Sequence, residues 1–524
     1  MSYRVVIPTA GTGSRLGVST KHLNKSLVSV AHRPTLSHQI EMFPTDSEFV
    51  IALGHKGDLV RQFLNMAYPK RKFYFVEVFP FSGQGSGLGH SLSCCAQYLQ
   101  QPFVFLSCDT LVTEPIPEPN KNWMGYANLT EFDQYRALDI IDNKVNDILE
   151  KGASSEGLRY PYIGLSGIFD YEIFWNAIMS GSASAVDQGE SYGLRNILNQ
   201  SSISAHQFSW HDIGTPDSLR KTREHYRAMD EPTILEKENE EIWFVGKKVI
   251  KFSTDEKFIR NRVERSEKLA GFVPTVLQNT KNMYAYHKAS GKVLSQAITL
   301  PLFEKFLAYS KRFWEPVTLS SVEKAAFQER CHRFYLDKTV ERVKAFYETF
   351  GRSDGKESIN GESMPTLAYL LEQVDWSDLA NGLPGRFHGD FHFENILWNA
   401  ETQQFTLLDW RQDFAGDLQV GDIYYDLAKL LHGLIISHDL IVKNHYHVSW
   451  LSKEINFSLL RKQDLVECEQ RFYHWCKDNG FSDKKVKILT ALIYLNIAAL
   501  HHFPYSLLLF VLGKRMLNRE ISKP

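Results

Sequence analysis

The first half of the chain alternates short apolar runs with helix-like segments, and this alternation strongly limits how the chain can fold. The apolar runs occupy residues 4–7, 49–53, 73–76 and 103–106. Such alternation is typical of βαβ units, in which helices connect the strands of a mostly parallel sheet. The first half is therefore predicted to form an α/β domain of Rossmann-like architecture.

A charged segment at residues 230–241 interrupts this pattern. Residues 242–252 follow it and are predicted to form two strands around a tight turn, and the chain after about residue 295 is largely helical in pattern, with one strand-like interruption at residues 387–411. A chain of 524 residues is too long for one core. We therefore predict two domains, residues 1–230 and residues 231–524, the second of mixed α+β type.

Charge and composition exclude some classes of protein. The net charge of −2 argues against a dedicated nucleic-acid binder, since such proteins concentrate positive charge. The first residues show no signal-peptide order, and the six cysteines show no metal-ligand spacing, so a cytoplasmic protein with reduced thiols is expected. The apolar stretch at residues 488–512 is interrupted by polar residues and a proline, which favours two buried helices over a membrane span. Oligomerisation stays open.

The motif Gly11-Thr12-Gly13-Ser14-Arg15 follows the first apolar run. Glycines such as Gly11 and Gly13 let backbone N–H groups approach a triphosphate, and Arg15 adds charge-assisted hydrogen bonds. A dinucleotide-binding turn would have a third glycine where Leu16 stands. The motif therefore indicates a phosphate-binding turn of another kind.

This segment resembles the nucleoside-triphosphate transferase family, which makes NDP-sugars and CDP-choline-like compounds. Lys25 stands at the place of the family's lysine, and further motifs follow in the family's order along residues 3–228. The resemblance implies that Gln84, Gly85 and Ser86 belong to a loop that contacts the nucleobase. It also implies that Asp109 and Asp212 bind Mg²⁺ and that Lys151, which follows Glu150, contacts the phosphate of the acceptor.

The chemistry suits these residue types. A phosphate monoester has a second pKa of about 6, so near neutral pH it can attack a nucleotide α-phosphorus without a general base. The site must supply charge neutralisation and in-line positioning. Arg15 and Lys25 are expected to act on the α-phosphate and the departing pyrophosphate, and the two aspartates to hold the metal.

The most specific motif lies in the second half of the chain. His388-Gly389-Asp390-Phe391-His392-Phe393-Glu394-Asn395 is followed by Asp409 in Leu408-Asp409-Trp410. This arrangement resembles the catalytic loop and the metal-binding aspartate of the aminoglycoside phosphotransferase and choline kinase family. It implies that Asp390 accepts a hydroxyl proton while Asn395 and Asp409 hold Mg²⁺ on the phosphates of ATP. The two histidines are interpreted as structural supports of the loop.

Other parts of a kinase fold should surround this loop. Lys251 is expected to contact the ATP phosphates and to pair with Glu264, although Glu267 offers a second candidate. The acidic residues of the segment Gly421-Asp422-Ile423-Tyr424-Tyr425-Asp426 are interpreted as supports. We find neither a glycine-rich loop of the protein-kinase type nor an Ala-Pro-Glu segment, and both absences favour a kinase for small molecules.

Together the two halves indicate sequential activation of one hydroxyl compound. The kinase would phosphorylate it with ATP, and the transferase would join the phosphorylated product to a nucleotide, with CTP favoured over UTP. An amino alcohol such as choline, a polyol or a sugar is the expected compound, destined for a surface glycan. A cation-binding cage for choline would need aromatic side chains. The candidates are Tyr424, Tyr425, Trp450, Tyr473 and Trp475. The favoured interpretation of these residues is that they belong to an ordinary helix core.

Two alternatives remain at this point. In one, only one half is active and the other half is a regulatory binding module. In the other, the second half phosphorylates a protein.

Overall fold

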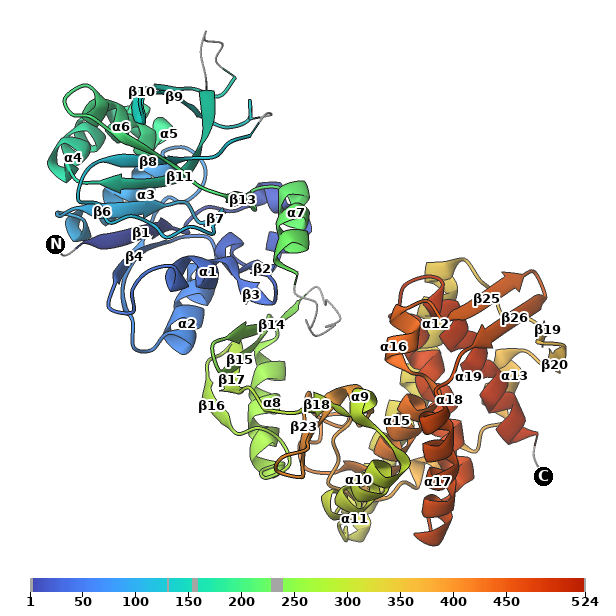
Figure 1. Ribbon diagram of the computed structural model, residues 1–524. Coiled ribbons are helices and arrows are strands. Elements are labelled where there is room, and N and C mark those ends of the chain that lie inside the picture. Colours follow the sequence, from blue (N-terminus) through green and yellow to red (C-terminus); the bar gives the residue numbers. More distant parts are fainter. Residues whose placement is uncertain (1–2, 130–131, 153–158, 228–238, 523–524) are drawn as a thin grey trace. The chain divides into compact units, whose positions relative to one another are not determined.

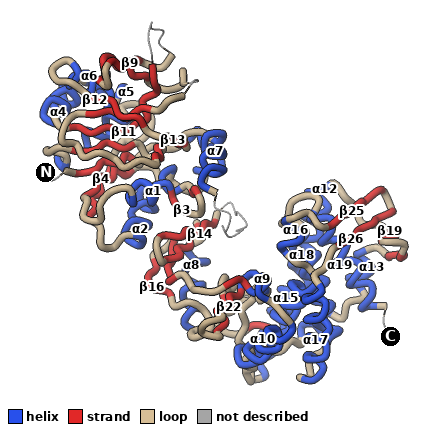
Figure 2. Tube along the Cα trace, in the orientation of Figure 1, coloured by secondary structure: helices blue, strands red, loops and turns tan. Residues whose placement is uncertain are grey.

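The computed structural model describes residues 3–129, 132–152, 159–227 and 239–522 (Figure 1). The chain forms two compact units, of which the first contains Met1–Glu256 and Leu277–Tyr286 and the second contains Lys257–Val276 and His287–Pro524. Strands are concentrated in the first unit, and most of the second is helical (Figure 2). The predicted fold class, an α/β domain followed by an α+β domain, is confirmed.

A nine-stranded sheet forms the centre of the first unit, in the order β5-β4-β1-β6-β11-β8-β12-β10-β9. Strands β5, β4, β1 and β6 run parallel, as the βαβ pattern predicts, whereas β11 pairs antiparallel with β6. The strands of this sheet are β1 (Arg4–Pro8), β4 (Glu48–Leu53), β5 (Lys72–Glu77), β6 (Phe103–Leu106), β8 (Trp123–Tyr126), β9 (Ala137–Ile141), β10 (Lys144–Leu149), β11 (Arg159–Ile168) and β12 (Ser204–Gln207).

Alternate residues of the parallel strands pack on opposite faces of this sheet. Val5 and Ile7 contribute to one core while Val6 contributes to the other. This division follows from the two-residue period of a strand, and it explains why the apolar runs lack polar residues. Helices cover the two faces (Figure 1), and their bounds are α1 (Thr35–Glu41), α2 (Gly57–Ala67), α3 (Leu88–Cys95), α4 (Tyr171–Ser180), α5 (Ser182–Gln188), α6 (Glu190–Leu198) and α7 (Pro216–Tyr226). Two short strands, β7 (Thr110–Val112) and β13 (Trp210–Asp212), pair beside the sheet.

A second sheet belongs to the first unit although it follows the predicted boundary. It has the order β14-β15-β17-β16, with β14 (Glu240–Val245), β15 (Lys248–Ser253), β16 (Val276–Asn279) and β17 (Met283–His287). The expected hairpin at residues 242–252 is thus confirmed. Trp243 is fully buried, lies 5.2 Å from the ring of Phe63 and donates a hydrogen bond of 3.0 Å to Ser29 Oγ. The compact unit therefore extends beyond residue 230, which itself lies outside the described residues.

Helices dominate the second unit. They are α8 (Glu256–Lys268), α9 (Leu294–Ala297), α10 (Leu300–Phe313), α11 (Ser321–His332), α12 (Lys338–Phe350), α13 (Leu367–Glu372), α14 (Trp376–Ala380), α15 (Ile423–Ile435), α16 (His438–Val442), α17 (Gln463–Asp478), α18 (Asp483–Ala498) and α19 (Tyr505–Ile521). Helices α18 and α19 occupy the apolar stretch that was predicted to form two buried helices, and both contribute to the core. Among the described residues no helix combines the length and the apolar character that a membrane crossing needs.

Strands of the second unit include β22 (Ile396–Asn399) and β23 (Gln404–Leu407), which lie between Asn395 and Asp409 in the chain and form a sheet with β18 (Lys292–Val293). The strand-like interruption predicted at residues 387–411 is confirmed. Another sheet, of β19 (Glu357–Ile359), β20 (Glu362–Met364), β25 (Tyr446–Leu451) and β26 (Glu454–Leu459), was not predicted. Its strands are short and partly polar, so they show no apolar run by which a sequence could reveal them.

Candidate active sites

The first unit contains a cavity of about 160 Å³ beside the ends of β6 and β13. Four residues that were predicted from separate motifs line it: Arg15, Asp109, Lys151 and Asp212. These residues are spread over almost 200 positions of the chain. The sheet brings them together because its strands end at a common edge, which is where ligands bind in open α/β sheets.

Local packing fixes Lys25 next to this cavity. The buried Asn24 donates hydrogen bonds to Thr9 O at 2.8 Å and to His55 O at 2.7 Å, which holds the turn before Lys25 in place. Gly13 has a φ of 65°, and a Cβ atom there would lie 3.0 Å from Lys25 Cβ. Position 13 thus requires glycine for both its backbone conformation and its close contact with the lysine.

Asp109 and Asp212 converge on the backbone of Gly214. A Cβ atom on Gly214 would lie 3.1 Å from Asp212 Oδ1 and 3.4 Å from Asp109 Oδ2. Lys25 Nζ forms an ion pair of 2.5 Å with Asp109 Oδ2. Burial opposes the ionisation of Asp109, but this ion pair outweighs it and lowers the pKa, whereas burial raises the pKa of Asp212. Two neighbouring carboxylates with one lysine form a site that a further cation would stabilise.

Lys151 is an exposed residue at the edge of the cavity. Its neighbour Glu150 forms ion pairs with Arg136 at 3.1 Å and with Arg195 at 2.6 Å. Glu150 is therefore held in the structure by two arginines. Lys151 lines the cavity, and its contact with the phosphate of the acceptor stays a prediction.

The loop with Gln84, Gly85 and Ser86 is not part of the lining of this cavity. Gln84 and Gly85 are exposed, and Ser86 hydrogen-bonds within its own turn to Gly83 O at 2.6 Å. Gly11 is also exposed, and a Cβ atom there would meet no atom within 4 Å. The nucleotide-binding roles of these four residues stay predictions.

Sequence reasoning missed several residues of the cavity. Tyr135 donates a hydrogen bond of 3.2 Å to Asp212 Oδ2, and Arg136 and Tyr162 also line the wall. Glu190, at the start of α6, is only 4% exposed, and no hydrogen-bond donor among the described residues reaches its Oε2 atom. Burial raises the pKa of Glu190 to about 7. None of these residues lies in a recognisable motif, so the sequence offered no signal for them.

The second site is the loop that ends in β22. Gly389 has a φ of 89°, and a Cβ atom there would lie 2.5 Å from Arg411 Cβ, so the loop needs glycine. Asn395 Nδ2 donates hydrogen bonds of 3.0 Å to both the backbone oxygen and Oδ2 of Asp390. Leu408 N donates to Asn395 O at 2.7 Å, which ties the segment before Asp409 to the loop. The structure thus brings Asp390, Asn395 and Asp409 together as the motif implies.

The two oxygens of Asp390 have different partners. Oδ2 faces Asn395 and also His392, whose Nε2 lies 3.5 Å away, whereas Oδ1 forms an ion pair of 2.9 Å with Lys429. Burial opposes the ionisation of Asp390, but Lys429 and His392 outweigh it and hold the pKa well below its usual range. Asp390 is therefore an ionised hydrogen-bond acceptor, and Lys429 is a neighbour that sequence reasoning did not identify.

Asp426 supports this loop by accepting hydrogen bonds from its backbone. It accepts hydrogen bonds from His388 N at 2.6 Å, from Gly389 N at 2.7 Å and from Trp314 Nε1 at 3.1 Å. His388 is fully buried, and burial lowers its pKa to about 3, so its ring is neutral. These contacts match the structural roles expected for Asp426 and His388.

Asp409 forms an ion pair with Arg262 of α8. Arg262 is almost completely buried, whereas Glu264 and Glu267 on the same helix are exposed. Lys251 is buried in β15 and belongs to the first unit, whereas both glutamates belong to the second. The pairing of Lys251 with Glu264 stays a prediction, and Arg262 is the residue of α8 that contacts the predicted metal ligand.

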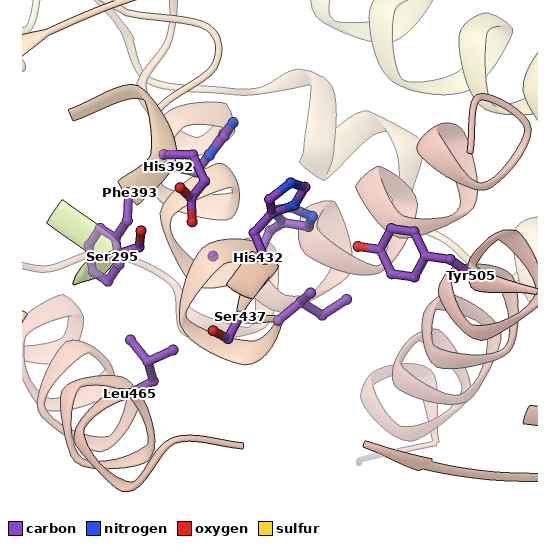
Figure 3. Close-up of a pocket in the computed structure, with 11 residues that line it drawn as sticks. Ser295, His392, Phe393, His432, Ser437, Leu465 and Tyr505 are labelled. Carbon is purple, nitrogen blue, oxygen red and sulfur yellow. The ribbon is translucent and has the colours of Figure 1, made fainter. Parts of the chain in front are cut away.

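A pocket adjoins His392 on the second unit (Figure 3). Its wall includes His432, Ser437 and Tyr505, and the hydroxyl group of Tyr505 points toward His432 (Figure 3). Both ring nitrogens of His432 are buried, and no hydrogen-bond partner among the described residues reaches them. Burial keeps the pKa of His432 well below its usual range. The pocket therefore presents the neutral ring of His432 and hydroxyl groups close to the catalytic loop, and Glu394 also lines it.

The five aromatic residues considered for a cation cage are engaged in other contacts. Trp450 packs on Phe510 at 5.8 Å and Trp475 stacks on Phe481 at 5.5 Å. Tyr425 lies 5.0 Å from Phe334 in an edge-to-face contact. Lysine ammonium groups lie 5.0 Å from the ring of Tyr424 and 4.4 Å from that of Tyr473. Tyr424, Tyr425, Tyr473 and Trp475 lie on helices α15 and α17, as the interpretation as helix core expects. Trp450 is also a core residue, but it lies in strand β25 and not on a helix.

Both sites offer the oxygen ligands that Mg²⁺ prefers. No group of three or more His, Cys, Asp or Glu side chains suited to a metal ion occurs in the part of the chain that the structure describes. Mg²⁺ needs fewer, because it usually takes one or two protein carboxylates and completes its coordination with water and phosphate oxygens. Asp109 with Asp212, and Asn395 with Asp409, therefore fit a magnesium ion that binds together with a nucleotide.

Fold and geometry define a protein with two sites, a carboxylate-lined α/β cavity and a kinase-like catalytic loop. Residues 339–444 match the model of the phosphotransferase enzyme family. This match contains Asp390, Asn395 and Asp409, so the carboxy-terminal region holds a segment of that family, and the resemblance seen in its motifs is confirmed.

Curated relatives match the amino-terminal region. Over 240 residues the chain is 23% identical to the bifunctional protein GlmU of Methanococcus vannielii, which corresponds to 44% of this chain and 56% of the relative. The corresponding protein of Methanococcus maripaludis is 22% identical over 230 residues, or 42% of this chain and 54% of the relative. The chain thus spans just over half the length of these relatives.

Solved structures of nucleotidyltransferases are similar to part of the chain. The CTP:phosphocholine cytidylyltransferase from Streptococcus pneumoniae is 18% identical, with a TM-score of 0.36, over 43% of this chain and 100% of its own. The UDP-glucose pyrophosphorylase from Acinetobacter baumannii is 14% identical, with a TM-score of 0.37, over 43% of this chain and 93% of its own.

Proposed function

We propose that the protein is a bifunctional transferase that phosphorylates a small hydroxyl compound and then joins the product to a nucleotide. The observation that carries this proposal is the convergence of Arg15, Asp109, Lys151 and Asp212 on one cavity. These residues come from separate motifs of one family, and the second region adds a complete phosphotransferase loop. A kinase product is a phosphate ester, which is the class of acceptor that a nucleotidyltransferase uses.

In the first reaction, the hydroxyl oxygen of the acceptor attacks the γ-phosphorus of ATP. The bond from that phosphorus to the bridging oxygen breaks, and ADP leaves. Asp390 accepts the hydrogen bond of the hydroxyl group, orients its oxygen and takes up its proton as the new bond forms. Asn395 and Asp409 would hold Mg²⁺, which neutralises charge on the phosphates when it is bound.

In the second reaction, a phosphate oxygen of the phosphorylated acceptor attacks the α-phosphorus of a nucleoside triphosphate. The bond to the β-phosphate breaks, and pyrophosphate leaves. Lys151 would hold the phosphate of the acceptor, and Arg15 and Lys25 would stabilise negative charge on the α-phosphate and the pyrophosphate. Asp109 and Asp212 would hold Mg²⁺ at this site. CTP is the favoured nucleotide, and UTP is the alternative. The proposed product is a nucleotide-linked precursor, made in the cytoplasm, for the synthesis of a surface glycan.

The test is a screen of the purified full chain with ATP, Mg²⁺, a panel of hydroxyl compounds and either CTP or UTP, analysed by mass spectrometry. We expect a new nucleotide-linked compound that Asp390→Asn abolishes and that added phosphate ester restores. Asp212→Asn should instead leave the phosphorylated compound as the final product. Phosphorylation without a nucleotide-linked product under any triphosphate would contradict the two-step scheme and leave a kinase with a binding module. Phosphorylation of proteins alone would identify a protein kinase.

A further inference from the structure

The environment of Asp390 is unusually rich in cations. Lys338 and Arg342 lie four residues apart on α12 and therefore share one face of that helix. Lys338 Nζ lies 4.5 Å from the ring centre of Phe334, and Arg411 Cζ lies 4.9 Å from the same ring. Lys429 is the fourth basic residue, and it forms an ion pair with Asp390. We call Lys338, Arg342, Arg411 and Lys429 the cation cluster.

The cluster lacks the carboxylates that would balance it. Among the described residues, no Asp or Glu forms an ion pair with Lys338, Arg342 or Arg411. The Nε atoms of Arg342 and Arg411 are buried, and no hydrogen-bond acceptor of the described chain reaches them. Burial and the neighbouring cations lower the pKa of Lys338 to about 6, so its surroundings disfavour its positive charge. Lys338, Arg342 and Arg411 are half-buried, and cations removed from water usually have an anionic partner, which the described residues do not supply to these three.

A π-helical turn stands at the start of this face. Residues Arg333–Asp337 form it, and it joins α11 directly to α12. Such turns are rare in proteins, and those that occur are often found at functional sites. Here the turn immediately precedes Lys338, and its Phe334 ring is the surface on which Lys338 and Arg411 lie.

The partners of Asp390 indicate whether ATP or the hydroxyl compound would supply an anionic group to the cation cluster. Oδ2 faces Asn395, a predicted ligand of the metal on ATP, whereas Oδ1 faces Lys429 and the cation cluster. Two members of the cluster lie on α12 and one on α15, and neither helix carries a predicted nucleotide ligand, whereas the fourth member, Arg411, lies two residues after Asp409. The cation cluster thus lies on the side of Asp390 Oδ1, whereas Asn395, a predicted metal ligand, holds Asp390 Oδ2.

We propose that the hydroxyl compound phosphorylated at Asp390 carries a negatively charged group, a carboxylate or a phosphate, which the cation cluster binds. This inference rests on the proposed kinase function and narrows its substrate class. It argues against choline and other cationic alcohols, since a cation beside four basic side chains would be repelled. A hydroxy acid or an already phosphorylated alcohol has the required charge.

The experiment compares hydroxyl compounds in sets that differ only in charge. One set is glycerate, glycerol and serinol, and another is glucuronate, glucose and glucosamine, each given to the full chain with ATP and Mg²⁺. We expect kcat/KM for the anionic member of at least one set to exceed that of its neutral and cationic counterparts about tenfold or more. Preference for a neutral or cationic member would overturn the inference while leaving the kinase function standing.

Variants separate the acceptor from ATP as the source of the anion. Lys338→Gln with Arg342→Gln should raise the KM for the anionic acceptor about tenfold and leave the KM for ATP unchanged, and Lys338→Arg should retain most of the affinity. Lys344→Gln is the matched control, because Lys344 lies on the same helix with a side chain 76% exposed. A rise in the KM for ATP instead would assign the cluster to the γ-phosphate and overturn the inference.

Binding provides a second measurement that does not need turnover. If no alcohol is phosphorylated, the proposed function fails, and calorimetric titration of the anionic compounds still tests the cluster. Binding by the wild-type chain that the double variant loses would support an anion site at the cluster. Equal binding, or none, in both proteins would overturn it, and thermal unfolding of each variant verifies that it is folded.

Discussion

The two candidate sites differ in how the chain assembles them and in how their charges are balanced. In the first unit, residues spread from Arg15 to Asp212 meet at the edge of a sheet, and acids and bases pair with one another, as Lys25 does with Asp109. In the second unit, Asp390, Asn395 and Asp409 lie within twenty positions, and cations outnumber the acids around them. A site can thus be fixed by topology or by a local turn, and unbalanced charge indicates what a substrate must bring.

The strongest test of this comparison separates the two chemistries. Asp390→Asn keeps the shape of the loop but removes the anionic acceptor, so phosphorylation should fall by about 10²–10⁴-fold, the usual contribution of a positioned acid–base group. Nucleotidyl transfer to a phosphate ester supplied from outside should be unchanged, as measured by pyrophosphate release. A loss of both activities would show that the two sites do not act independently.

The reciprocal change is expected to have a somewhat smaller effect. Asp109→Asn removes one of the two metal-binding carboxylates and leaves Lys25 without its partner, so nucleotidyl transfer should fall by about 10²–10³-fold. ATP-dependent phosphorylation should continue, and mass spectrometry should detect the phosphorylated intermediate accumulating. Thr113→Ala, a nearby change at an exposed position, serves as the control. Full transfer activity in Asp109→Asn would exclude Asp109 as a metal ligand.

The balance of charge in the first cavity can be tested by pH. Glu190 has a folded-state pKa of about 7 against an ordinary value of 4.5. Between these values the folded protein retains a proton that the unfolded chain has released. The stabilising effect of that proton is complete below pH 4.5 and is lost as the pH rises through 7.

Glu190→Gln should therefore remove about 3 kcal/mol of pH-dependent change in the free energy of unfolding, since one pKa unit corresponds to about 1.36 kcal/mol. Urea titrations of both proteins at pH 5 and pH 8, followed by tryptophan fluorescence, measure the difference. The variant should gain stability relative to the wild type at the higher pH. The same difference at both pH values would mean that Glu190 does not titrate in this range.

The smallest expected effect concerns a surface cation of the second unit. Lys344 pairs only at 3.9 Å with Glu348, and both side chains are exposed. Lys344→Ala should change the free energy of unfolding by less than about 0.5 kcal/mol, because exposed ion pairs contribute little. Thermal unfolding measures this change, and a large loss of stability would indicate that α12 has a partner on its exposed face.

The alternation of apolar runs predicted the fold class, and the motifs predicted four residues that line the first cavity. Arg15, Asp109, Lys151 and Asp212 could be found because each belongs to a short motif that keeps its order along the chain. Glu190 and Arg136 could not, because they reach the cavity from elements with ordinary sequences. The cation cluster was hidden for the same reason: Lys338 and Arg342 show only the spacing of a solvated helix face, and only packing brings Lys338 near Asp390.

Strand prediction failed where apolar patterning is weak. The hairpin of β25 and β26 contains only two buried residues, Trp450 and Ile455, so it lacks a continuous apolar run. The predicted boundary at residue 230 relied on a change of composition. Such a change marks where the pattern alters, but it does not reveal that Trp243 further along packs against Phe63.

The position of Trp243 has a consequence for separating the protein into parts. A gene cut at residue 230 would leave the first fragment with an uncovered apolar surface around Phe63, which favours aggregation. The compact units also alternate along the chain, since residues 257–276 belong to the second unit and residues 277–286 to the first. A single cut in the gene therefore cannot separate one complete unit from the other.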